Sequence, residues 1–589
     1  MELLELPDNE LSAVLDRCSG AQLASLAQTC RRLRALVDGD AKRWRAACTG
    51  WRHSWWQPPS GAASWKQAWL RRTACDMPVN RLLLTASMQD GDDVGCIQIA
   101  RSPHDSSSSS GGSDDGGSAG DHALSARPLA VKPMTLPHWC PFGKHIAYVV
   151  RPGVHGKQRY AVTVARLFGD NLRLLPVLEF GTNSEPFFLA WTPDGQHVSF
   201  LTPRAGEDIA LRVVPLSAFT PVPGDDAGSS RRPGRQLPTH PLDGQGGDGS
   251  DAWCIVHSLP LFYDFSPVRE HVVMTHGGAM DMRLVSYNTQ PDGAPVQSAR
   301  NVPVWCAPDG RWRADAFPLA NLDRLQLFQA PSYTPDGKHV LFVSIQVHEP
   351  DGLSFRLLLT CAQLPSREAA AQNEHMCTTS WILKARDHQG GVEPLSATRF
   401  AVSPDARLLV WTKLGGRLVR LIHLADTLAR DLGSSQAAGQ CTCGQVVHDD
   451  SGDDLVLDAS VAAFLWSPCS RYLLVLTEEA TPLVAGQWRK WQVWSMAGEP
   501  RRLFSTDEVL LTSAMEHILL PFYEQYFRTT CTLWAPDSSA FCYAAMDMTS
   551  GDNACFVQQL PEGEAEAPPP RIVDTGNGAR FDMVFWSPQ

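Results

Sequence analysis

Two glycine-rich strings have the spacing of catalytic or cofactor-binding loops. Gly116-Gly117-Ser118-Ala119-Gly120 matches the string that presents a nucleophilic serine, but that turn needs a strand before it and a helix after it, and this copy lies in a Ser/Gly run. Gly244-x-Gly246-x-x-Gly249 matches a dinucleotide-binding fingerprint, yet Asp, Gly and Pro surround it where a βαβ unit is required. We therefore expect no catalytic residue and no cofactor.

Cysteine, histidine and aspartate groups raise the question of a metal. Cys441 and Cys443 with His448 offer thiolate and imidazole ligands for zinc, but a lone Cys-x-Cys lacks the paired spacing of zinc ribbons. Aspartates cluster as potential calcium ligands without the regular alternation of a calcium loop, at positions 90, 92 and 93 and at 449, 450, 453 and 454. The sequence predicts solvated loops with free thiols and no metal site.

Composition limits the partners and the compartment. The 589 residues hold 51 Lys and Arg against 63 Asp and Glu, so the formal charge of −12 has the wrong sign for a nucleic-acid partner. No run of 18 uncharged apolar residues occurs, which argues against a membrane partner. The 16 cysteines include no Cys-x-x-Cys pair, and no secretory signal or glycosylation sequon is present. We expect reduced thiols and a cytoplasmic and/or nuclear protein.

The elements that would position any site differ along the chain. Over residues 1–50 the apolar residues recur at helical spacing, Pro7 suits a first helical turn, and Ser19 with Gln22 forms a capping box, which together predict three short helices. Residues 51–80 are expected to be a helical linker. Three helices have too little interior to bury every apolar position, so the stripe predicts a binding surface. The linker tryptophans Trp51, Trp55 and Trp56 either pack this domain against the next or form an exposed contact.

From residue 81 the pattern changes to short apolar strands separated by a recurring turn, Ser/Thr/Ala-Pro, often followed by Asp-Gly. Pro fixes φ at the turn, Asp caps it and Gly accepts positive φ. The repeated prolines lie 52 to 74 residues apart, which suits one four-stranded propeller blade per repeat. These prolines are Pro141, Pro193, Pro267, Pro335, Pro404, Pro468, Pro536 and Pro588.

The fold class is therefore predicted to be multidomain, with a small all-α domain followed by an all-β propeller over residues 81–589. Eight blades are favoured, and seven is the alternative. A near-copy of the turn at residues 306–310 breaks the spacing and is interpreted as a loop. Residues 579–586 are expected to close the ring by pairing near residues 82–85. Tryptophans at the turns are interpreted as blade packing, with a ligand cage as the alternative, at positions 139, 191, 305, 466, 534 and 586. Disordered excursions are predicted near 105–127, 203–252 and 431–454.

The N-terminal block resembles the F-box: Leu6-Pro7-Asp8-x-Glu10-Leu11-x-x-Val14-Leu15, then Leu23-x-x-Leu26-x-x-x-Cys30-Arg31-x-Leu33-Arg34, then Trp44-Arg45. That resemblance implies docking on a Skp-type adaptor and, through it, on a cullin-RING ubiquitin ligase. The adaptor-binding residues that it implies are Leu6, Pro7, Leu11, Val14, Leu15, Leu23, Leu26, Cys30, Leu33 and Trp44.

The repeat resembles the TolB-like class of propeller more than the WD-repeat class, because the turn is Ser/Thr-Pro-Asp-Gly and no Trp-Asp dipeptide occurs. Residues 521–526, Pro-Phe-Tyr-x-Gln-Tyr, also resemble a segment of propellers that accompany prolyl oligopeptidases. Propellers of this kind serve as binding platforms and as enzyme gates, so the resemblance is specific for fold and not for ligand.

Taken together, the two resemblances imply the substrate-recognition subunit of an SCF-type E3 ubiquitin ligase, with no chemistry of its own and a protein substrate bound by the propeller. The alternative is a propeller-based small-ligand binder or enzyme in which the F-box serves only to control degradation of the protein itself. Perturbed carboxylates or histidines converging at the central channel would favour the alternative.

Overall fold

The computed structural model describes the chain from Leu82 onward, with gaps. The described ranges are 82–87, 96–101, 129–130, 133–141, 143, 145–151, 160–168, 173–182, 184–203, 209–222, 254–258, 262–267, 272–277, 281–286, 300–301, 312–314, 331–348, 355–363, 378–385, 398–413, 416–424, 445–447, 454–478, 488–561, 567–573 and 581–588. The predicted three helices, the linker and the excursion 105–127 lie outside them.

Most described residues are in strands, and these strands form eight sheets. In the first half of the chain the sheets are β3 (Leu129–Ala130), β2 (Cys96–Arg101), β1 (Leu82–Ala86) and β34 (Met583–Trp586); β4 (His138–Trp139), β5 (His145–Val150), β6 (Tyr160–Phe168), β7 (Arg173–Thr182) and β11 (Thr220–Pro221); β8 (Phe187–Trp191), β9 (His197–Pro203), β10 (Ile209–Pro215) and β12 (Cys254–Ser258); and β13 (Phe262–Phe265), β14 (Val272–Gly277), β15 (Asp281–Ser286) and β16 (Arg300–Asn301).

The second half supplies the other four sheets. They are β17 (Trp312–Ala314), β18 (Ser332–Tyr333), β19 (His339–His348), β20 (Phe355–Gln363), β21 (Thr378–Ala385) and β25 (Gln445–Val447); β22 (Thr398–Val402), β23 (Leu408–Lys413), β24 (Leu418–His423) and β26 (Asp454–Val456); β27 (Ser460–Trp466), β28 (Tyr472–Glu478), β29 (Arg489–Ser495) and β30 (Arg501–Ser505); and β31 (Ala540–Met546), β32 (Asn553–Gln559) and β33 (Arg571–Ile572). All pair antiparallel except β25, which runs parallel to β21.

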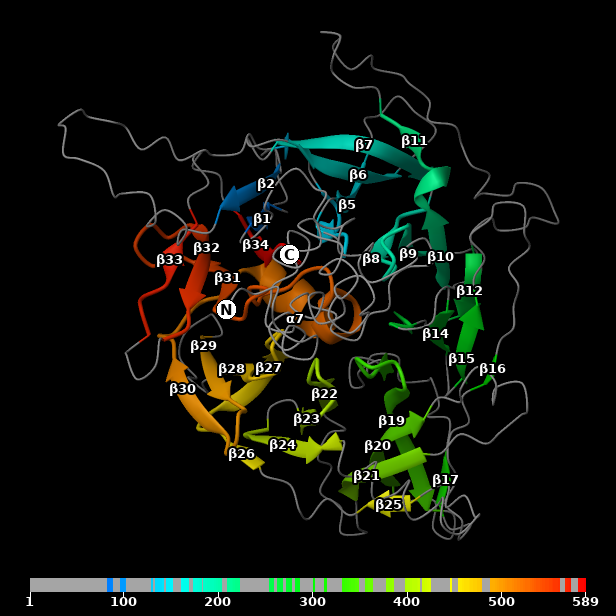
Figure 1. The fold of residues 1–589 in the computed structure, drawn as a ribbon, viewed down its shortest axis with the longest axis vertical. Coiled ribbons are helices and arrows are strands. Elements are labelled where there is room, and N and C mark those ends of the chain that lie inside the picture. The colour runs from blue at the N-terminus through cyan, green and yellow to red at the C-terminus, as the bar shows by residue number, and fades with distance from the viewer. Residues whose placement is uncertain are drawn as a thin grey trace, which may run out of the picture.

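The sheets follow one another around a ring, in chain order from blue to red (Figure 1). The helical elements of the described chain are few and short: η3 (Leu216–Ala218), η6 (Met515–Leu519), α7 (Leu520–Phe522) and η7 (Tyr523–Phe527). Figure 1 shows α7 in the middle of the ring. No described helix has the length and apolar character needed to cross a bilayer.

The two ends of the described chain meet in one sheet, as predicted. β34 pairs antiparallel with β1, with Leu83 opposite Trp586 and Ala86 opposite Met583. Backbone bonds beyond the strands extend this pairing, since Ser587 N–H donates to the Leu82 carbonyl at 2.8 Å. The closure confirms the predicted role of the last strand, because β34 covers the edge of β1 that would otherwise be unpaired.

The recurring turn has one geometry in six of the described repeats. In the Thr192–Gly195 turn, the N–H of Gly195 donates to the Thr192 carbonyl at 2.8 Å, and Gly195 has φ of +63°. The Thr192 hydroxyl donates to the Asp194 carboxylate at 2.5 Å, and that carboxylate also accepts the Gln196 N–H at 3.0 Å. In this turn Asp194 therefore caps the turn, and Gly195 at the fourth position adopts the positive φ that leads into the next strand, as predicted.

Two predicted excursions contain strands, which corrects their boundaries. Within 203–252, residues 209–222 form β10, η3 and β11, because Ile-Ala-Leu-Arg-Val-Val-Pro supplies an apolar strand that pairs with β9 over its full length. Within 431–454, β25 pairs with β21. The short apolar runs that pair with neighbouring strands lie within low-complexity sequence, so the sequence pattern did not reveal them as strands.

Candidate functional site

The ten predicted adaptor-binding residues, from Leu6 to Trp44, lie outside the described residues, so the structure brings none of them together. The Ser118 and Gly244 strings, the Cys441-x-Cys443 group with His448 and the Asp90 cluster also lie outside them. Across the described ranges, no group of three or more His, Cys, Asp or Glu side chains is placed to hold a metal ion.

Tryptophans at the recurring turns join neighbouring sheets. The indole Nε1–H of Trp191 donates to the His138 carbonyl at 3.0 Å, and that of Trp534 donates to the Leu465 carbonyl at 3.2 Å. Trp466 makes the same contact with the Ala401 carbonyl at 3.3 Å. Each acceptor lies on the first strand of the preceding sheet, so these side chains pack blades together, as predicted, and do not form a ligand cage.

A set of buried and half-buried polar and aromatic groups surrounds a helical segment in the middle of the ring. We call residues Thr512–Cys531 the plug; it connects β30 to β31 and contains η6, α7 and η7. The plug reaches inner strands of several sheets, namely β4, β8, β13 and β22. It therefore ties together elements that are far apart in the sequence.

Aromatic side chains pack against one side of the plug. The Phe188 ring, on β8, stacks on Tyr526 with centroids 4.5 Å apart and meets Phe522 edge-on at 4.9 Å. Phe188 has φ of +48°, a left-handed conformation that costs a bulky residue energy. The Tyr263 hydroxyl donates to the Phe188 carbonyl at 2.8 Å and so fixes this conformation.

Four charged side chains form a second set of contacts, which we call the charge lock: Asp264 on β13, Arg399 on β22, and Glu524 and Arg528 on the plug. Arg528 Nη2 lies 3.3 Å from Asp264 Oδ2, and Asp264 also accepts the Tyr333 N–H at 2.9 Å. Arg399 Nη1 donates to the carbonyls of Leu520 at 3.3 Å and Pro521 at 2.8 Å. The lock thus joins two inner strands to the plug.

Burial shifts the pKa values in this cluster. Burial raises the pKa of the Asp264 carboxyl, against the opposing effect of Arg528. Burial likewise raises the pKa of Glu524 to about 7; Arg528 and Arg399 oppose the shift and Asp264 adds to it. Desolvation lowers the pKa of Arg399, which the Glu524 charge partly offsets. Low solvent access therefore dominates over the neighbouring charges.

The ends of the plug are anchored by polar contacts. At its start, Arg489 on β29 is buried and forms ion pairs at 2.6 Å with Glu516 of the plug and with Glu478 on β28. At its end, His138 Nδ1 lies 2.8 Å from the Thr530 hydroxyl, and burial lowers the pKa of His138 to about 3. The neutral His138 is buried with Cys531, so no open nucleophilic site forms there.

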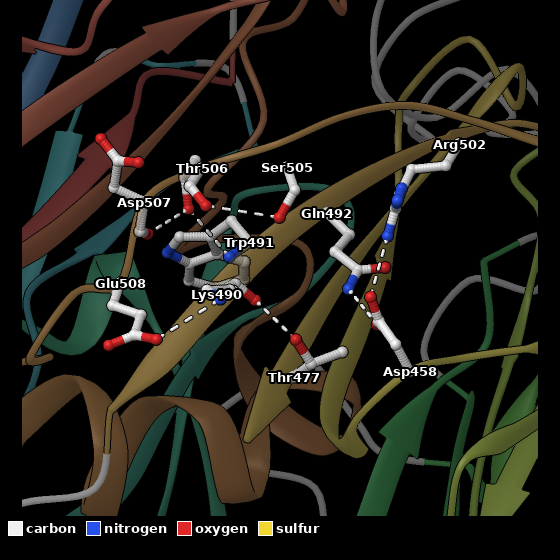
Figure 2. Close-up of polar contacts among 10 residues, drawn as sticks. All are labelled: Asp458, Thr477, Lys490, Trp491, Gln492, Arg502, Ser505, Thr506, Asp507 and Glu508. Carbon is white, nitrogen blue, oxygen red and sulfur yellow. Dashed lines mark hydrogen bonds and ion pairs between the residues drawn. The ribbon is translucent and has the colours of Figure 1, made fainter. Parts of the chain in front are cut away.

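The sheet that carries Arg489 also carries a network of polar side-chain contacts (Figure 2). Asp458 accepts from Gln492 Nε2 at 3.1 Å and pairs with Arg502 at 3.1 Å. Lys490 pairs with Glu508 at 3.4 Å. Asp458 and Arg502 are largely exposed, so this network stabilises the sheet weakly and offers no enclosed site.

The Pro521–Tyr526 segment is recognisable in the sequence, but its partners in the ring are not. Asp264, Arg399 and Phe188 lie far from it in sequence. Their strands also carry buried core residues such as Phe265, Phe400 and Leu189. Only the ring arrangement brings them to one place. The signal available beforehand was Arg528, a charge directly after an aromatic-rich run.

Comparison with known proteins identifies the N-terminal region. Residues 3–45 match the F-box domain. No curated protein matches the chain by sequence.

Solved structures resemble the chain at low identity. The dihydro-heme d1 dehydrogenase NirN is 11% identical, with 87% of this chain and 76% of that chain covered and a TM-score of 0.41. The β-propeller domain of Cps50 from Myceliophteria thermophila is 12% identical, with 72% and 96% covered and a TM-score of 0.32. TolB from Acinetobacter baumannii is 13% identical, with 73% and 66% covered and a TM-score of 0.27.

Proposed function

We propose that the protein is the substrate-recognition subunit of an SCF-type E3 ubiquitin ligase. The observation that carries the proposal is the F-box match at residues 3–45, followed by a ring of sheets in the same chain. F-box domains generally bind Skp1-type adaptors, so the N-terminal helices would join the cullin-RING ligase and the ring would bind a protein substrate. The protein would act in the cytoplasm and/or nucleus.

The ring is proposed to be an eight-bladed, TolB-like propeller. The eight sheets of the described residues and the pairing of β1 with β34 support this number. Such a ring is a rigid base for loops, and rigid loops lose less conformational entropy on binding than flexible ones do. The subunit would hold a substrate lysine near a ubiquitin-charged enzyme and so raise the effective concentration of that lysine.

The adaptor contact is tested with a Leu11→Asp, Leu15→Asp double variant. Both leucines lie on the proposed apolar stripe, so two carboxylates there should abolish co-purification with a co-expressed Skp-type adaptor. A Ser12→Asp, Ala13→Asp variant adds the same charge away from the stripe and should still co-purify. If the first variant stays folded and binds the adaptor as the parent does, the docking surface is wrong.

The alternative, a propeller that binds a small ligand or acts as an enzyme, has one observation in its favour. The charge lock is a cluster of carboxyls with raised pKa values in the middle of the ring, as this alternative requires. Asp264 and Arg399, however, are bound to parts of the plug, which accounts for them by a structural role. A ligand screen by thermal shift distinguishes a structural role of the charge lock from ligand binding. A ligand that binds at the centre of the ring should stabilise the parent but should no longer stabilise Asp264→Asn.

A further inference from the structure

The sequence contains one run of three consecutive prolines, Pro568-Pro569-Pro570, and this run lies at the edge of the last sheet. It directly precedes β33, which is the end strand of the sheet β31-β32-β33. Figure 1 shows β33 on the outside of the ring and β31 nearer its centre. The run is therefore presented at the periphery of the molecule.

Proline chemistry fixes the shape of this segment. Each proline ring holds its own φ near about −65° and keeps the preceding residue in the extended or polyproline II region. Ala567, Pro568 and Pro569 each precede a proline, and residues 567–570 form neither helix nor strand. A polyproline II helix has no internal hydrogen bonds, so its carbonyls can accept hydrogen bonds from a partner.

Both ends of the run are held on the sheet. The Pro568 carbonyl accepts a hydrogen bond from Nε2 of the buried Gln558 at 2.6 Å. On the other side, β33 pairs with β32, and the Val573 N–H donates to the Cys555 carbonyl at 2.8 Å. An extended segment that is fixed in this way loses little conformational entropy when a partner binds it.

The residues after the first proline are exposed. Pro569 and Pro570 face solvent and Ile572 is 50% exposed, whereas Val573 is buried. Prolines at a sheet edge also hinder pairing with other chains, because they lack an N–H. That protective role requires no exposed isoleucine beside the prolines. The apolar surface of Pro569, Pro570 and Ile572 therefore calls for a second explanation.

We propose that residues 568–572 are a docking site for a protein domain with an aromatic-lined groove, of the kind that binds polyproline II segments. Such grooves pack aromatic rings against proline rings, and tryptophan and tyrosine can also donate hydrogen bonds to the carbonyls. Consecutive residues of a polyproline II helix point about 120° apart. Pro569 and Pro570 thus offer two faces to the groove, while Pro568 is held to the sheet. This partner is additional to the adaptor and substrate of the proposed function.

A panel of purified SH3, WW and EVH1 domains, each labelled and titrated with the full-length chain in a fluorescence anisotropy assay, tests the proposal. At least one domain should bind the parent at least about tenfold more tightly than it binds a Pro569→Ala, Pro570→Ala variant. Both prolines are exposed, so the urea midpoint of this variant should match that of the parent. The matched control is Pro58→Ala, Pro59→Ala, which changes the other Pro-Pro dipeptide and should bind as the parent does.

Ile572→Ser distinguishes docking from edge protection, because it keeps all three prolines. It should weaken binding of the same domain by about threefold or more, since half of an isoleucine side chain is no longer buried by the partner. The proposal is overturned if no domain of the panel binds the parent, or if the bound domain has equal affinity for the parent and either variant. The assay contains no adaptor or ligase, so its outcome is independent of the proposed function.

Discussion

At the scale of single residues, the fourth position of the recurring turn shows how backbone geometry limits residue choice. It has positive φ in the six described copies of the turn, and glycine occupies it at 143, 195 and 337. Alanine or serine occupies it at Ala406, Ser470 and Ser538, with φ between 59° and 62°. Ser470 offsets the cost, because its hydroxyl accepts the Asp405 N–H of the preceding turn at 3.0 Å.

Ala406→Gly should stabilise the protein by about 0.5–1 kcal/mol, because the left-handed conformation penalises a Cβ and Ala406 has no compensating side-chain bond. The urea midpoint of unfolding, measured by fluorescence, checks this. Ser470→Gly is the matched control. It relieves the same strain but loses the bond to Asp405, so its midpoint should not rise.

A second residue-scale prediction compares two buried turn tryptophans. Trp534→Phe removes an indole donor from the Leu465 carbonyl, whereas the Trp586 Nε1 is buried without a hydrogen-bond partner among the described residues. Trp534→Phe should therefore destabilise the chain by about 1 kcal/mol more than Trp586→Phe does. Equal losses in the two variants' urea midpoints would show that the Nε1 bond contributes little.

At the scale of elements, closure of the ring depends on one short strand. β34 has four residues, all buried, and it pairs with β1 from the other end of the described chain. Its removal would expose the edge of β1 along the inner face of the first sheet. Unpaired strand edges promote association between chains.

Deleting residues 579–589 should therefore abolish the cooperative unfolding transition and cause aggregation, and not merely shorten a tail. Differential scanning calorimetry and size-exclusion chromatography measure the two effects. Replacing residues 562–566, between β32 and β33, by a Gly/Ser linker of equal length is a control that leaves β34 intact. A deletion variant with the melting curve of the parent would refute the closure role.

At the scale of the whole molecule, the ordered ring and not the low-complexity segments is expected to bind the substrate. A variant with 105–127 and 223–252 replaced by short linkers spares β10, η3 and β11, which the ring requires. It should still capture the proteins that accumulate with the parent under proteasome inhibition, because ordered loops carry the binding contacts. Loss of those partners from a folded variant would assign recognition to the replaced segments.

The sequence alone was sufficient for features that depend on local chemistry. Pro, Asp and Gly at fixed offsets predicted the turn, because φ preferences and short side-chain bonds act within four residues. The spacing of the turns predicted repeated sheets, and the Leu-Pro pattern at the N-terminus predicted the F-box match. The boundaries of β10 and β25 were missed, because the partners that order them lie in other segments of the chain.

The contacts at the centre of the ring depend on the tertiary structure and could not be predicted from the sequence. The contacts of Phe188 with Tyr526 and of Asp264 with Arg528 join residues at least 264 positions apart, and nothing in the local sequence of either partner specifies the other. The raised pKa of Glu524 has the same origin, since desolvation depends on everything packed around a group and not on its neighbours in the chain. Turn geometry is a short-range property of the backbone, whereas burial and charge pairing at the ring centre exist only once all the sheets have closed around it.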